Sequence, residues 1–275
     1  MIKVINKISA TLLQELYREG LEFFDLKAAA QILDDRNEAS LRRVLSDMVK
    51  HGLIMRLRDG LYTIIPYHSE PDFYFPNWHI VAHYLVGDTP YYIGYYSALT
   101  LHDLSLQPSL SEQIVVSHPI RPTTQLIKDI PFQFITHNTP HFFGFSKRWI
   151  EQGTFRIYCS DLEKTLIDCA FKPDYAGGVS QLSHALYKSR AVLNPTILLN
   201  YTQRFGSDAV VRRLGFLLEA LDILPELAGA LKEQINKTTS YVALDTALPK
   251  TGQMYSRWGI VQNLDLVTIQ SVNFT

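Results

Sequence analysis

The dipeptide Asp59-Gly60 is the feature that most restricts how the first part of this chain can fold. It lies inside the segment LIMRLRDGLYTII, which begins at Leu53 and has apolar residues on both sides of the dipeptide. Asp-Gly between two such runs predicts a β-hairpin with a type I′ turn, because both central residues of that turn need positive φ. We therefore expect two short antiparallel strands over residues 53–65.

Three helix-like segments precede the hairpin. Residues 8–19 carry leucines at helical spacing and stop before Gly20, residues 26–33 follow a capping Asp25, and residues 37–52 run from a capping Asn37 to Gly52. Three helices followed by a hairpin is the order of a winged helix-turn-helix, whose third helix enters the major groove. The predicted class is α+β, with a winged helix-turn-helix over residues 1–66 and a larger mixed α/β domain over residues 67–275.

Basic residues are concentrated on the third helix and the hairpin. Between Arg36 and Arg58 there are six basic residues and two acidic ones, whereas residues 1–35 carry a net charge of -2 and the whole chain -1. Arginine suits bidentate contact with guanine and with phosphate, and a basic hairpin tip suits contact with the DNA backbone or minor groove. A solvated helix face or a protein-docking module is the competing interpretation. The candidate DNA-binding residues are Arg36, Arg42, Arg43, Ser46, Lys50, Arg56 and Arg58.

Strand and helix patterns alternate in the rest of the chain. Strands are expected over residues 111–119, 130–138 and 154–160, and helices dominate from Ser160 onward. Ser160 and Glu163 have the spacing of a capping box. In VVRRLGFLLEAL, one of the two arginines, Arg212 or Arg213, is expected to reach inward to a carboxylate such as Asp168, because a buried guanidinium without a partner is costly. Gly215 is expected to allow close approach of a second helix.

Composition fits a protein with a large core: 47% of the residues are hydrophobic and 19% are charged. The two cysteines, Cys159 and Cys169, belong to no zinc or disulfide pattern, so we expect reduced, buried thiols in a cytoplasmic protein. The sequence shows no signal peptide and no apolar stretch long enough for a membrane span. No cofactor is expected.

Three sets of residues are of types that can carry out chemistry in other proteins. Asp161, Glu163 and Asp168 are the type of residues that hold a divalent metal in nucleases, but Asp161 and Glu163 fall in a first helical turn and Asp168 can pair with Lys164 or Lys172. His79 and His83 have i,i+4 spacing without an HExxH frame. Neither cysteine lies in a catalytic signature, so we expect no enzymatic activity.

Three segments of the chain together carry a family resemblance: LRDGLYTI at the end of the predicted hairpin, DLEKTLIDCAFKPDYAGG, and VVRRLGFLLEAL together with the later SRWGIVQN. In these segments the chain resembles the AbiEi family, the antitoxin and transcriptional-regulator component of bacterial abortive-infection toxin–antitoxin pairs. The resemblance implies a repressor that binds inverted repeats in its own operator. It also implies a C-terminal domain that opposes a nucleotidyltransferase-like toxin, without requiring a stable complex with that toxin.

The expected function is therefore that of a DNA-binding antitoxin and autorepressor whose partners are double-stranded operator DNA and such a toxin. Two alternatives stay open. One is a stand-alone regulator whose second domain senses a small ligand, with the aromatic segment YYIGYYSALTLHDL lining a pocket. The other is a metal-dependent nuclease that uses Asp161, Glu163 and Asp168.

Overall fold

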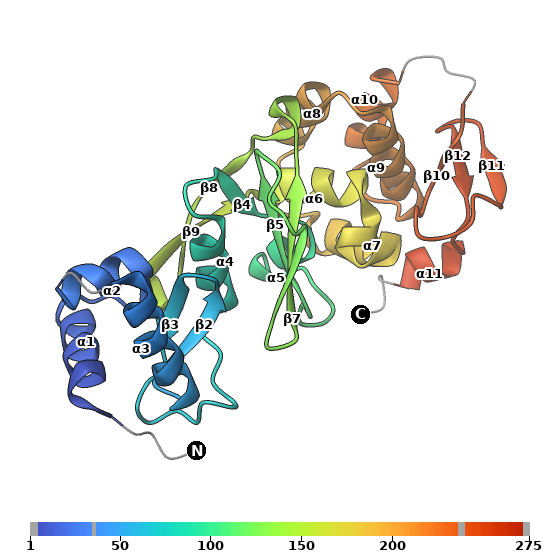
Figure 1. Ribbon diagram of the computed structural model, residues 1–275. Coiled ribbons are helices and arrows are strands. Elements are labelled where there is room, and N and C mark those ends of the chain that lie inside the picture. Colours follow the sequence, from blue (N-terminus) through green and yellow to red (C-terminus); the bar gives the residue numbers. More distant parts are fainter. Residues whose placement is uncertain (1–4, 35–36, 236–239, 272–275) are drawn as a thin grey trace. The chain divides into compact units, whose positions relative to one another are not determined.

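The computed structural model describes residues 5–34, 37–235 and 240–271, and in this part of the chain it combines helices with three β-sheets (Figure 1). The α+β class is confirmed. The chain divides into two compact units, Met1–Gly87 and Asp88–Thr275. Within the described ranges, none of the helices combines the length and the apolar character that crossing a membrane requires.

The three predicted helices of the first unit are present, and polar side chains cap their first turns. The helices are α1 (Lys7–Arg18), α2 (Leu26–Ile32) and α3 (Glu38–Lys50). The Asp25 carboxylate accepts a hydrogen bond from the Ala28 amide at 2.8 Å, and the Asn37 side chain accepts one from Ala39 at 2.8 Å. These contacts satisfy amides that have no partner inside the helix, and both predicted caps are confirmed.

A three-stranded antiparallel sheet completes this unit. Its strands are β1 (Phe23–Asp25), β2 (Ile54–Arg58) and β3 (Leu61–Ile64), in the order β1-β3-β2. The predicted hairpin is confirmed, but the type I′ turn is wrong: Gly60 has a φ of +73°, whereas Asp59 is not in the left-handed region. The pairing register shifts between Arg56 and Arg58, so β2 has one extra residue relative to β3 just before the turn. Strand β1 was missed because its three residues run directly into α2.

The core of the first unit joins its helices to the sheet. Tyr62 is 4% exposed and its ring packs 5.7 Å from that of Phe24, so it contributes to the core of this unit. The unit extends beyond the boundary expected at Pro66, because α4 (Trp78–Val86) also belongs to it. The Tyr84 ring of α4 stacks on Phe23 of β1 at 4.4 Å.

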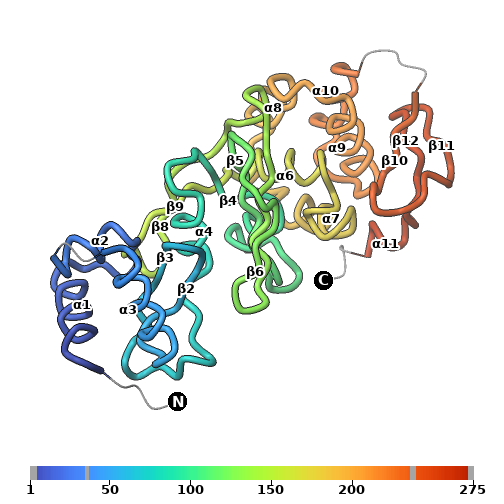
Figure 2. The backbone as a smooth tube through the Cα atoms, in the orientation of Figure 1, coloured from blue at the N-terminus to red at the C-terminus, as the bar shows by residue number. Residues whose placement is uncertain are grey.

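The second unit is built around a six-stranded mixed sheet with the strand order β6-β7-β5-β4-β9-β8. Strands β5 and β7 are parallel, as are β4 and β9, and the other neighbours are antiparallel. The course of the backbone through this unit can be followed in Figure 2. The strands are β4 (Tyr91–Ile93), β5 (Glu112–Val116), β6 (Thr124–Ile127), β7 (Ile130–Thr136), β8 (Phe145–Ile150) and β9 (Phe155–Ser160).

Helices and a small second sheet form the rest of this unit. The helices are α5 (Tyr95–Leu101), α6 (Leu162–Phe171), α7 (Gly178–Ser189), α8 (Pro195–Phe205), α9 (Asp208–Ala220), α10 (Pro225–Glu233) and α11 (Leu266–Gln270). Short 3-10 turns occur at η1 (Thr139–His141), η2 (Glu151–Gly153) and η3 (Pro173–Ala176). The small sheet contains β10 (Val242–Ala243), β11 (Gln253–Tyr255) and β12 (Ile260–Gln262). Cys159 and Cys169 are buried free thiols, as expected.

The predicted capping box at Ser160 is wrong by one residue. Asp161 is the N-cap of α6 and accepts a hydrogen bond from the Lys164 amide at 2.8 Å. The Ser160 hydroxyl instead bonds the Thr165 hydroxyl at 2.7 Å, and the Glu163 carboxylate accepts from the Asn194 amide at 2.8 Å.

Helix α9 lies in the core of the second unit, and both of its arginines point inward. Arg212 and Arg213 are 2% and 4% exposed, so the predicted inward arginine is confirmed, and the second arginine is buried as well. Asp168 is not their partner: Arg213 donates to the carbonyls of Ala170 at 2.8 Å and Leu244 at 3.0 Å.

The space beside Gly215 is filled by Trp258 rather than by a second helix. A Cβ atom at position 215 would lie 2.0 Å from the indole of Trp258. That contact distance is impossible, so glycine is required here by the packing of an aromatic ring.

Candidate nucleic-acid interface

The exposed face of α3 carries three of the predicted DNA-binding residues. Arg43, Ser46 and Lys50 are exposed and separated by three and four positions, which places them on one side of the helix. The opposite side holds Leu41, Leu45 and Met48 in the core. Burial of these apolar residues therefore fixes which face of α3 is presented to solvent.

The charge on this face is only partly compensated. The Lys50 ammonium lies 3.7 Å from the carboxylate of Asp47, and both side chains are at least half exposed. Arg43 forms no ion pair with another described residue. An unpaired exposed guanidinium can bind phosphate or a base edge without first breaking a contact within the protein.

Arg42 is oriented differently from Arg43. Its guanidinium pairs with Glu38 through Nε at 2.9 Å and with Asp59 in the β2–β3 turn through Nη1 at 2.8 Å. Hydrogen bonds to the two carboxylates raise the pKa of Arg42, and the same contact lowers the pKa of Asp59. Arg42 thus connects α3 to the hairpin tip. The sequence offered one signal for this contact, the acidic residue at the predicted turn.

Arg56 and Arg58 project from β2 into solvent, whereas Met55 and Leu57 are buried. Neither arginine forms an ion pair with another residue of the described chain. Helix α3 packs against β2 within the same unit, so the two sets of exposed cations belong to adjoining elements. Arg36, the remaining candidate, lies outside the described residues.

The three carboxylates considered for a metal site have separate partners. Asp161 caps α6 and accepts a hydrogen bond from the Tyr201 hydroxyl at 2.9 Å, while Glu163 accepts from Asn194. Asp168 is fully buried against the Lys164 ammonium. Among the described residues no group of three or more His, Cys, Asp or Glu side chains is arranged to hold a metal, and this includes His79 and His83.

Asp168 belongs to a buried polar cluster that was not predicted from the sequence. The i,i+4 pair with Lys164 was expected, but the Tyr92 hydroxyl also donates to Asp168 at 2.9 Å and the Lys164 ammonium donates to that hydroxyl at 2.8 Å. His137 bonds the hydroxyls of Tyr92 at 3.2 Å and Tyr95 at 2.8 Å.

Burial sets the protonation of this cluster. Loss of solvation raises the pKa of Asp168, lowers that of Lys164 and lowers the pKa of His137 to about 3. His137 is therefore neutral at pH 7 and bonds the two tyrosines as a neutral imidazole. Each polar group of the cluster is held by others from distant parts of the chain, which is the arrangement of a structural core network.

Comparison with known proteins identifies a solved structure with a similar fold. No family model matches the chain, and no curated protein matches it. Among solved structures, the chain is similar to the RV2827C protein from Mycobacterium tuberculosis, with a TM-score of 0.73 and 14% sequence identity over 99% of this chain and 97% of that one. At this identity the similarity shows that the two chains share a fold across both units.

Proposed function

We propose that the protein is a DNA-binding transcriptional repressor whose first unit is a winged helix-turn-helix. The observation that carries the proposal is the set of exposed cations on two adjoining elements, α3 and β2, in a chain with a net charge of only -1. In this arrangement α3 enters the major groove and the β2–β3 hairpin follows the flanking backbone or minor groove.

The side chains then have distinct roles. Arg43, Ser46 and Lys50 face the groove, and their donors suit base edges and phosphates. Arg56 and Arg58 meet the backbone beside it. Arg42 is a positioning residue, because its bonds to Glu38 and Asp59 hold the hairpin tip against the helix.

The resemblance to AbiEi proteins supports a more specific role as the antitoxin of an abortive-infection pair, one that represses its own operon and opposes a nucleotidyltransferase-like toxin. No residue of the second unit is assigned to that activity. Co-expression of the chain with the product of the adjacent gene tests it: growth should be rescued, and unrelieved toxicity would argue against the antitoxin role.

DNA binding is tested with the full chain and DNA from upstream of its own gene, by fluorescence anisotropy over a range of salt concentrations. The double variant Arg43→Ala/Lys50→Ala should bind more weakly and should lose about 0.9 from the slope of log K against log salt for each phosphate contact removed. Arg42→Ala should weaken binding with a smaller change in slope, because it acts through the hairpin tip.

Arg18→Ala is the matched control. Arg18 is also an exposed arginine, 72% exposed, but it lies on α1 and pairs with Glu15. It should bind DNA as the unmodified chain does. Equal affinity and salt dependence for the double variant and the unmodified chain would reject docking through α3.

A second candidate function, a regulator that responds to a small ligand, is favoured by one observation. The second unit contains a cavity of about 720 Å³ whose lining includes Tyr96, a residue of the aromatic segment predicted to line a pocket. Binding of a ligand there is compatible with DNA binding by the first unit.

A further inference from the structure

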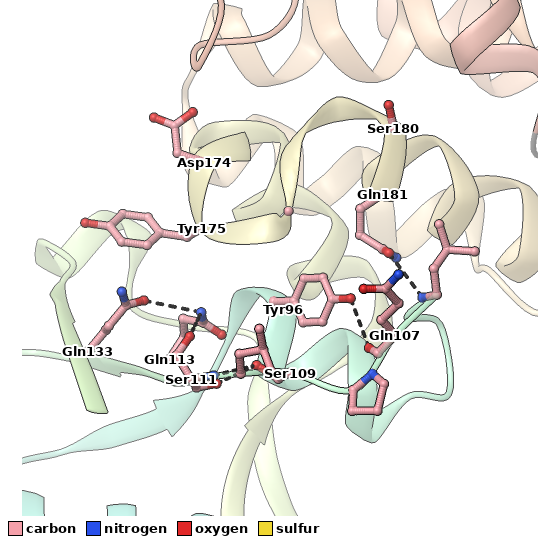
Figure 3. A pocket seen from close by; sticks show the side chains of 14 residues that line it. Tyr96, Gln107, Ser109, Ser111, Gln113, Gln133, Asp174, Tyr175, Ser180 and Gln181 are labelled. Atoms are coloured by element: carbon pink, nitrogen blue, oxygen red, sulfur yellow. Dashed lines mark hydrogen bonds between the residues drawn. The ribbon is translucent and has the colours of Figure 1, made fainter. Parts of the chain in front are cut away.

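A cavity of about 720 Å³ lies within the second unit, between the beginning of α7 and one face of the six-stranded sheet (Figure 3). Two of its lining residues are Gln113 on β5 and Gln133 on β7, which are direct neighbours across parallel strands. Because neighbouring residues of adjacent strands point to the same face, the sheet presents two side-chain amides to the cavity at this position.

Several lining side chains are held in place by other parts of the unit. The side-chain carbonyl of Gln113 accepts a hydrogen bond from the backbone amide of Ser97 at 3.0 Å. The side-chain nitrogen of Gln113 donates to the Ser111 hydroxyl at 2.9 Å. The Gln181 nitrogen donates to the Leu104 carbonyl at 2.8 Å. These residues cannot turn away from the cavity without losing hydrogen bonds, so its shape is largely formed before any ligand enters.

Tyr96 forms a fixed aromatic part of the lining. Its hydroxyl donates to the Gln107 carbonyl at 2.9 Å, and its ring lies directly against Gly177. A Cβ at position 177 would be 2.9 Å from the Tyr96 ring, and Gly177 has a φ of +78°. Glycine is therefore required here both by the backbone and by the close approach of the ring.

At the other end of the cavity, polar groups remain available. Figure 3 shows Gln133 and Tyr175 at this end, away from Gln181. The side-chain carbonyl of Gln133 accepts a hydrogen bond from the Gln113 side chain at 3.3 Å. The side-chain nitrogen of Gln133 is left as a donor with no partner among the described residues. The Tyr175 hydroxyl likewise has none there, while its ring packs 5.4 Å from that of Tyr95.

The lining is nearly uncharged. Among the described residues that line it, Asp174 is the one carboxylate, and Thr246 donates to it at 2.7 Å. The same lining residues include no Lys, Arg or His, and the Lys172 ammonium lies 5.6 Å from the centre of the Tyr175 ring without being part of the lining. A phosphate or carboxylate group would find no cation in this lining to replace its hydration, so an anionic ligand is disfavoured.

We infer that this cavity binds an uncharged ring compound rich in hydroxyl groups, a nucleoside or a saccharide. Such hydroxyls donate and accept hydrogen bonds and so match the amide and hydroxyl groups of Gln133, Ser111 and Tyr175. The flat or apolar face of the ring compound packs against the tyrosine side chains. The inference does not depend on DNA binding by the first unit.

Isothermal titration calorimetry on the full chain tests the inference with two panels, the four common ribonucleosides and a set of neutral mono- and disaccharides. Each compound is compared with its monophosphate. At least one neutral compound should bind with a Kd below about 1 mM, and its phosphorylated form should bind at least about tenfold more weakly. The panel that contains the ligand identifies which of the two sources it has.

Gln133→Ala should reduce the affinity about fivefold or more, because the variant lacks the available amide donor. Gln133→Glu keeps the size of the side chain and should also weaken binding, since it adds a second carboxylate. Gln203→Ala removes an exposed glutamine of α8 that does not line the cavity, and it should bind as the unmodified chain does. Absence of binding in both panels, tighter binding of the phosphates, or full affinity in both Gln133 variants would overturn the inference.

Discussion

Helices α3 and α9 begin in almost the same way and have opposite environments. Each has 13 residues, an acidic first residue and an Arg-Arg pair at the fifth and sixth positions. In each, the first arginine lies near the acid four residues earlier, with Arg42 2.9 Å from Glu38 and Arg212 3.6 Å from Asp208. Yet Arg43 is exposed, whereas Arg212 and Arg213 are both buried.

The residues that follow the arginine pair account for the difference. In α3 they are VLSDMVK, which leaves one polar side, and in α9 they are LGFLLEA, which is apolar almost all round. A helix of the second kind is enclosed by its neighbours, and its arginines must then find acceptors inside the protein. An arginine pair is therefore available for contact with a partner molecule only in a helix that keeps one polar face.

The largest effect on stability is expected from Arg213→Ala. The variant leaves the buried carbonyls of Ala170 and Leu244 without their donor, and each lost acceptor costs about 1–3 kcal/mol. We expect the free energy of unfolding to fall by about 3–5 kcal/mol in urea denaturation followed by circular dichroism.

Arg213→Lys retains a positive charge but cannot donate in several directions at once, so it should recover only part of the loss. A loss below about 1 kcal/mol in Arg213→Ala would show that water replaces the guanidinium and that the burial of α9 does not depend on it.

A smaller effect is expected from Gly215→Ala in the same helix. The added Cβ would overlap the indole of Trp258, which is 1% exposed and donates to Glu219 at 2.9 Å. Overpacking of this kind costs about 1–3 kcal/mol, and thermal denaturation should show the lower stability.

Gly229→Ala in α10 is the matched control for that variant. Nothing lies within 4 Å of a Cβ at position 229, so the substitution should stabilise the helix by up to about 1 kcal/mol. Equal stability of the two variants would contradict the close packing of Trp258 on α9.

The same contrast explains what the sequence could and could not predict. Capping residues such as Asp25 and Asn37 act over two or three positions, so the helices of the first unit were predictable from local pattern. Arg42 and Arg213 also bond Asp59 and Ala170, which lie 17 and 43 positions away, and no rule of local spacing indicates these two contacts. For this reason the exposed side of α3 and the i,i+4 pair of Glu38 with Arg42 follow local rules, whereas the bond from Arg42 to the hairpin tip does not.

A pH effect is expected from the buried polar groups of the second unit. Because the folded pKa of His137 is about 3 and the unfolded value is about 6.5, the unfolded chain binds more protons between these pH values. The contribution of neutral His137 to the free energy of unfolding is fully present above pH 6.5 and is lost as the pH falls toward 3. At pH 5 the free energy of unfolding should be about 2 kcal/mol lower than at pH 7 because of His137 alone.

The measurement compares the unmodified chain with His137→Gln, which keeps a polar group beside the two tyrosines. The difference in unfolding free energy between the two proteins should shrink by that amount from pH 7 to pH 5. A difference that does not change with pH would mean that His137 can take up a proton without leaving its site.

The smallest effect is expected from Arg43→Ala, the counterpart of Arg213→Ala at the sixth position of α3. Arg43 is exposed and forms no ion pair with another described residue, so its removal should change the free energy of unfolding by no more than about 0.5 kcal/mol. The same urea denaturation serves both variants, which makes the ratio of their effects the direct measure of the comparison. If Arg43→Ala destabilised the protein as much as Arg213→Ala, Arg43 would be part of the folded core and could not be free to contact DNA. A stable Arg43→Ala protein that has also lost affinity for operator DNA would separate the two uses of the same dipeptide, because folding would depend on one arginine pair and recognition on the other.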